Sequence, residues 1–102
     1  MENEKPNLIV DKTIEFSLKI IEFTELLSAK NKKVIANQLF RSGTSVGANA
    51  WKAQSAESRA DFIHKMKISA KEADESEYWL ILCNRAPNYP DCKEILLELK
   101  SI

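Results

Sequence analysis

The scarcity of chain-breaking residues is what most constrains the fold of this chain. Its 102 residues include only two glycines and three prolines, and Pro87 and Pro90 lie close together near the C-terminal end. A β-sandwich needs a turn about every 8–12 residues, which this sequence does not supply. Long uninterrupted helices are the alternative, so the sequence predicts an all-α fold.

Length and composition predict a single soluble domain over residues 1–102, in which residues 1–7 form a flexible polar tail. Fifteen basic and fifteen acidic residues cancel, which argues against a dedicated nucleic-acid-binding protein but leaves room for a local basic patch. No apolar run approaches the ~18 residues that cross a membrane, and no signal-peptide pattern opens the chain. Cys83 and Cys92 are not in a C-x-x-C arrangement. We therefore expect a cytoplasmic protein with reduced thiols and no membrane partner.

Four helices are predicted, at residues 8–29, 34–54, 59–85 and 91–102. The polar cluster at residues 30–33 marks the first turn, and Ser58 with Asp61 gives a capping signal for the third helix. Proline cannot donate a helical hydrogen bond, so the third helix must end before Pro87. Asp91 with Glu94 repeats the capping signal for a short last helix. Short connections between long helices predict an up-down-up-down antiparallel four-helix bundle.

The first predicted helix carries two apolar stripes. One consists of Ile9, Phe16, Ile20, Phe23 and Leu27, and the other of Val10, Ile14, Leu18 and Ile21. A surface helix in a monomer needs only one stripe, about 100° wide. The second stripe is therefore covered either by the short last helix or by another subunit, and the shortness of that helix favours self-association into a homo-oligomer.

The second helix has glycines in its interior, at Gly43 and Gly47. An interior glycine costs a helix about 1 kcal/mol relative to alanine, which is usually offset by close packing of a neighbouring helix. A phosphate-binding loop would also contain glycines, but this segment lacks the Walker lysine and a preceding strand. The glycines thus predict tight helix packing.

The third helix is expected to bury Phe62, Ile63, Met66, Ala70, Ala73, Leu80 and Ile81. Glu77 falls in the same arc, and a buried carboxylate needs a partner or a raised pKa. Ser42 and Asn49 lie seven residues apart at the edge of the inner face of the second helix. We expect Ser42, Asn49 and Glu77 to form a structural polar cluster that fixes the helix register.

Three aromatic residues lie at the edges of the predicted core arcs, namely Phe40, Trp51 and Trp79. Aromatic side chains in such places are commonly core, but they are also enriched where subunits or partners dock. These three residues are therefore candidates for an oligomer interface.

Catalytic, metal and cofactor sites have little support. His64 is the only histidine, on a helix face shared with lysines, and the Glu-x-x-His pairs of di-metal bundles are absent. We expect no enzyme activity, no metal and no cofactor.

Nucleic-acid binding is a sharper hypothesis, and its candidate residues are Lys32, Lys33, Arg41, Lys52 and Arg59. Repeated in an oligomer, a modest basic patch would bind RNA or DNA multivalently. The alternatives are that these charges only solubilise the surface, or that the protein is an interaction scaffold without a nucleic-acid ligand.

Four sequence motifs occur in a characteristic order, namely RSGTSVGAN at 41–49, SRADFIHK at 58–65, KEA at 71–73 and EYWL at 77–80. Together they resemble the bacterial four-helix-bundle protein family, also called 23S rRNA intervening-sequence proteins. The resemblance covers most of the chain and is strongest over residues 38–82.

The resemblance implies a four-helix bundle that assembles as a ring-like homopentamer. It extends to the accessory bundle proteins of diversity-generating retroelements, which bind nucleic acid and a reverse transcriptase. One departure stands out, because Lys52 occupies a position where the family commonly has glutamate.

Overall fold

The computed structural model describes residues 7–102, which form four helices and no strands. The helices are α1 (Leu8–Ala29), α2 (Lys33–Ala53), α3 (Arg59–Arg85) and α4 (Lys93–Lys100). The three long helices agree with the prediction to within one residue at each end. The last helix is shorter than predicted, with eight residues.

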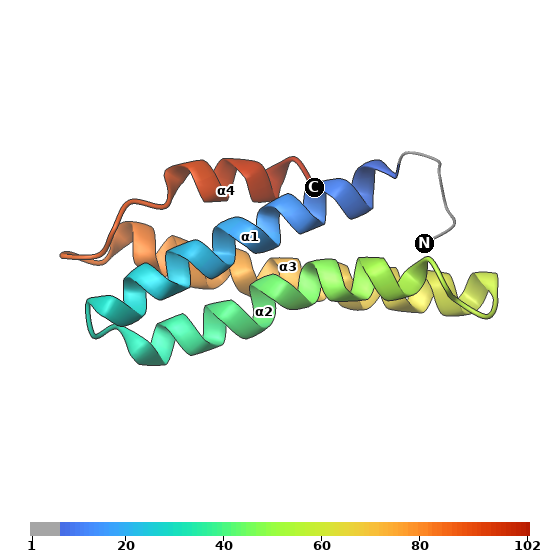
Figure 1. Cartoon of the computed structure of the whole chain (residues 1–102), viewed down its shortest axis with the longest axis horizontal. Coiled ribbons are helices and arrows are strands. Elements are labelled where there is room, and N and C mark those ends of the chain that lie inside the picture. The colour runs from blue at the N-terminus through green and yellow to red at the C-terminus, as the bar shows by residue number, and fades with distance from the viewer. Residues whose placement is uncertain (1–6) are drawn as a thin grey trace.

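Each helix packs on the next in sequence, and α4 closes the bundle by packing on α1 as well as on α3. The connections lie at alternate ends of the bundle, so the predicted up-down-up-down arrangement is confirmed (Figure 1). Figure 1 also shows that α4 covers only one half of the bundle, while the turn joining α2 to α3 lies at the far end from the α4 start.

Local signals explain where the helices begin and end. Asn7 is the N-cap of α1, and its side chain accepts a hydrogen bond from the Val10 amide at 3.3 Å. It was predicted to be part of a flexible tail, which is wrong for this residue; the rest of that predicted tail, residues 1–6, lies outside the described residues. Ser58 caps α3 by accepting from the Asp61 amide at 3.0 Å, as predicted. Asp91, by contrast, accepts from the Lys93 amide, and the N-cap of α4 is Cys92.

The core is built on α1 and α2 from the predicted side chains. Phe16, Ile20, Leu27 and Leu39 are fully buried. For α3 the predicted burial of Leu80 is confirmed, but the other buried residues are Ser69, Ser76 and Cys83, which were not predicted. Phe62 and Ile63 remain 40% and 42% exposed, since they lie on the part of α3 that extends beyond the end of α4.

Small residues line the contact between α2 and its two neighbours. A Cβ atom built on Gly43 would lie 2.8 Å from both γ carbons of Ile20 in α1, so the two backbones are closer than a methyl group allows. On the α3 side, the Ser76 hydroxyl donates to Ser42 Oγ at 2.9 Å, and the Ser69 hydroxyl donates to the Val46 carbonyl at 2.7 Å. The predicted tight packing around Gly43 is therefore confirmed.

The predicted polar cluster has a different composition. Ser42 is fully buried, but its partner is Ser76 and not Glu77. Asn49 donates to the Ser45 carbonyl of its own helix at 2.9 Å. Glu77 is only half-buried, and the hydroxyls of Ser69 and Ser76 make the polar contacts of α3 with the inner side of α2. The cluster of Ser42, Asn49 and Glu77 is thus corrected to a pair of serines.

We expect Gly43→Ala to lower the free energy of unfolding by up to about 2 kcal/mol. The added methyl group overpacks against the branched Ile20 side chain, which costs about 1–3 kcal/mol. The gain of about 1 kcal/mol in helix propensity offsets only part of that cost. Urea unfolding followed by circular dichroism measures it. The pair Gln38→Ala and Gln38→Gly, at an exposed position of the same helix outside the core, calibrates the propensity contribution alone. A Gly43→Ala protein more stable than the parent would contradict the close-packing account.

Candidate interaction surface

An extended apolar surface lies along the outer side of α1 and α2. From α1 it contains Val10, Ile14, Leu18 and Ile21, and from α2 it contains Phe40, Thr44, Ala48 and Trp51. We call these eight residues the α1/α2 face. Ile14, Leu18, Phe40 and Trp51 are 42%, 55%, 46% and 55% exposed. Seven of the eight, all but Phe40, line one groove of about 340 Å³ between the helices.

The α1/α2 face exists because α4 packs on a different side of α1. Lys19 of α1 forms an ion pair with Glu98 of α4 at 2.6 Å, and Lys12 donates to the Ser101 carbonyl at 3.1 Å. Phe23 and Ile95 are buried in the same core cluster. The sequence left two alternatives for what covers the second apolar stripe of α1, namely the short last helix or another subunit. The short last helix does not cover it, so that alternative is wrong.

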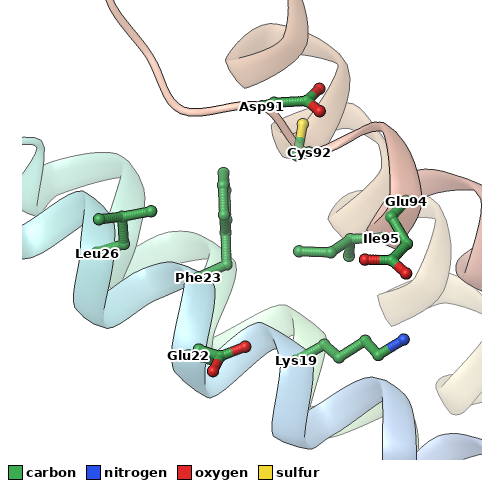
Figure 2. A pocket seen from close by; sticks show the side chains of 8 residues that line it. All are labelled: Lys19, Glu22, Phe23, Leu26, Asp91, Cys92, Glu94 and Ile95. Atoms are coloured by element: carbon green, nitrogen blue, oxygen red, sulfur yellow. The ribbon is translucent and has the colours of Figure 1, made fainter.

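A second hollow lies between α1 and the start of α4, with a volume of about 400 Å³. Figure 2 shows Lys19, Glu22, Phe23 and Leu26 of α1 facing the segment that carries Asp91, Cys92, Glu94 and Ile95. Lys19 is engaged by Glu98, so the rim carries the carboxylates of Glu22, Asp91 and Glu94 around an apolar floor. No group of three potential metal ligands occurs within residues 7–102.

The aromatic candidates for an interface lie in different places. Phe40 and Trp51 both belong to the α1/α2 face. Trp79 is half-buried against the core, and its indole nitrogen donates to a Glu75 carboxylate oxygen at 3.0 Å. Its ring also makes an edge contact with Tyr78, at 5.4 Å between centroids. Trp79 is thus on α3, separate from the α1/α2 face.

The structure does not bring the five basic candidates into one patch. Arg41 forms ion pairs with Glu72 and Glu75 across the contact of α2 with α3. Hydrogen bonds from Arg41 and then Trp79 lower the pKa of Glu75. Lys32 lies over the Tyr89 ring, 4.8 Å from its centroid, beside the exposed Lys33 at the α1–α2 turn.

Lys52 and Arg59 are exposed at the opposite end of the bundle, on either side of the α2–α3 turn. Neither forms one of the ion pairs found among residues 7–102. Of the five basic candidates, these two therefore lie at the same end of the bundle and outside the ion pairs of residues 7–102.

The two cysteine thiols are part of the packed core. Cys83 and Cys92 are free and buried, and burial raises the pKa of each to about 11. Both are therefore protonated thiols at neutral pH, and Cys92 donates to the Leu80 carbonyl at 3.2 Å. His64 is exposed on α3.

None of the helices in the described part of the chain has the length and apolarity to cross a membrane.

Comparison with known proteins identifies relatives of the whole bundle. The sequence model of the 23S rRNA-intervening sequence protein family matches residues 5–101. The chain is also similar to a crystal structure of a protein with unknown function from the S23 ribosomal protein family of Bacteroides thetaiotaomicron VPI-5482. The two chains are 40% identical, with a TM-score of 0.83 over 91% of this chain and 89% of the other. A search of curated proteins found no match. The chain therefore belongs to the 23S rRNA-intervening sequence protein family.

Proposed function

We propose that this is a non-catalytic assembly protein, whose copies associate through the α1/α2 face and together act as an adaptor for other macromolecules. The observation that carries the proposal is the exposure of Ile14, Leu18, Phe40 and Trp51 on one continuous surface. Monomeric proteins rarely expose large contiguous apolar patches, and tryptophan is enriched at the centres of interfaces.

The dimensions of the α1/α2 face suit a stable contact. A helix of the length of α1 is about 33 Å long, and two adjacent helices are roughly 20 Å wide. The outer side of α1 and α2, in which the α1/α2 face lies, therefore projects to on the order of 650 Å², and each partner buries ~800 Å² in a standard protein interface. The copy number we propose is five, following the ring-like homopentamer that the family resemblance implies.

The chemistry of the site agrees with a role in binding. The surface offers apolar side chains and no nucleophile with a lowered pKa, and the two thiols are buried and protonated. We place the function in the cytoplasm, where buried thiols such as Cys83 and Cys92 stay reduced.

We expect Leu18→Asp to dissociate the assembly while leaving the protomer folded. Leu18 is 55% exposed in the protomer, so the change costs little within one copy. In the assembly the substitution removes an apolar contact worth about 1.5–3 kcal/mol and buries a charge. The dissociation constant of the assembly should therefore rise at least tenfold. Size-exclusion chromatography with light scattering measures the mass.

The matched control is Leu97→Asp, on α4, where the side chain is 68% exposed and outside the α1/α2 face. This variant should keep the parental mass. A parent protein that is monomeric at micromolar concentration, or an unchanged Leu18→Asp assembly, would refute the proposal.

A second candidate function is binding of RNA or DNA by the assembly. It is favoured by Lys52 and Arg59, which are exposed at one end of the bundle outside the ion pairs of the described residues. In a side-by-side assembly, the same end of every copy lies on the same rim, so the two charges are repeated. Multivalent phosphate contacts raise affinity without new contact types, and they make it strongly salt-dependent.

We expect Lys52→Glu with Arg59→Glu to weaken binding of a fluorescently labelled single-stranded RNA at low salt, measured by anisotropy. The salt dependence should become shallower by about one unit of log–log slope for each lost phosphate contact. Lys93→Glu with Lys100→Glu, at exposed positions on α4, is the control of equal charge change. Absence of binding by the parent at low salt would rule out this second function and leave an interaction scaffold.

A further inference from the structure

An acidic edge borders the α1/α2 face along α1. Asp11, Glu15, Glu22 and Glu25 are all exposed, and none forms one of the ion pairs found among residues 7–102. Lys12 and Lys19 of α1 are both turned to α4. The hydrogen bond to Glu98 raises the pKa of Lys19 most, and of these four carboxylates Glu15 is the one near enough to raise it further. The outer side of α1 therefore presents four carboxylates next to the apolar stripe.

This charge pattern disfavours a contact in which α1 of one copy lies against α1 of another. A two-fold symmetric contact whose axis crosses the helices would make that pairing, because the same patch meets on both subunits. Four carboxylates would then face four carboxylates, and juxtaposed like charges oppose association strongly. A favourable partner surface must instead present basic groups beside exposed apolar ones.

The outer side of α3 has this composition. Lys67 and Lys71 are exposed one turn apart and take part in none of the ion pairs within the described residues. Further along the same side, Tyr78 and Leu82 are 57% and 37% exposed. Two carboxylates lie nearby, but Glu75 is held by Arg41, which leaves Asp74 against the two lysines.

The two surfaces lie at the same height along the bundle. Ser69, midway between Lys67 and Lys71, donates to Val46 of α2. The next residue of α2, Gly47, lies against Thr13 and Ser17, which flank Glu15 on α1. In addition, α1 and α3 run in the same direction, since they are alternate helices of an up-down-up-down bundle (Figure 1). Copies placed side by side in the same orientation therefore bring Glu15 level with Lys67 and Lys71.

We propose that the α1/α2 face of one copy docks on the outer side of α3 of a second copy, with the acidic edge of α1 opposite Lys67 and Lys71. The inference rests on the proposed self-assembly and specifies which surfaces meet. Because two different surfaces meet, a docked pair still has one free surface of each kind for further copies. Such a contact builds closed rings or filaments, whereas a two-fold contact stops at a dimer.

Charge reversal tests this pairing. One variant carries Asp11→Lys with Glu15→Lys, a second carries Lys67→Glu with Lys71→Glu, and a third carries all four changes. All four side chains are at the surface, and circular dichroism with thermal unfolding checks that each variant is folded. We expect the dissociation constant of each double variant to be at least tenfold higher than that of the parent. The fourfold variant restores opposite charges between the reversed positions and should regain the parental mass by light scattering.

Other outcomes separate this inference from the proposed function. If Leu18→Asp dissociates the assembly but Lys67→Glu with Lys71→Glu leaves its mass unchanged, the α3 pairing is wrong and self-assembly stands. If the fourfold variant stays dissociated like the Asp11→Lys/Glu15→Lys protein, α1 meets a surface other than α3, and the pairing is again wrong. A parent that is itself monomeric refutes the proposed self-assembly and with it this inference.

Discussion

The close approach of α2 to its neighbours is the constraint on which the rest of the structure depends. Gly43 leaves no room for a methyl group against Ile20, and Ser42 meets Ser76 through a single hydrogen bond. Small residues therefore occupy the closest contacts of α2, beside the buried Leu39 and Val46. Larger apolar side chains at the flanks of the same helices, such as Leu18 and Trp51, are then left at the surface. The α1/α2 face is thus a consequence of how tightly the helices pack.

The geometry of α4 has a comparable effect. Its eight residues are anchored to α1 by the ion pair of Lys19 with Glu98, on the side of α1 away from the α1/α2 face. The short helix completes the core over half of the bundle and does not extend along the rest of α3. Exposed apolar groups therefore remain both on the α1/α2 face and near Phe62. One side of the protomer core is covered by α4, and the α1/α2 face on another side is left exposed to a partner. This asymmetry is the basis of the proposed assembly.

The architecture could be predicted from the sequence, because it follows from the near absence of turn residues and from the glycines of α2. The inner face of α3 could not, since the prediction followed hydrophobicity. Phe62 and Ile63 were expected inside, whereas Ser69 and Ser76 are buried because a hydroxyl bonded within a tight helix contact behaves as a small core residue. Of the candidate sites, Phe40 and Trp51 were found to share a surface. The basic residues could not be grouped from sequence, because their separation depends on which end of the bundle each turn occupies.

The central claim is that the α1/α2 face is covered by another copy of the chain. Native mass spectrometry of the parent protein, purified without a nuclease step, tests it most directly. The account predicts a particle with a mass of several copies, and five by the proposed ring. Additional mass that nuclease removes would support the second candidate function as well. A bare monomer over the micromolar range would contradict the account, because the apolar surface would then be stable in water without a partner.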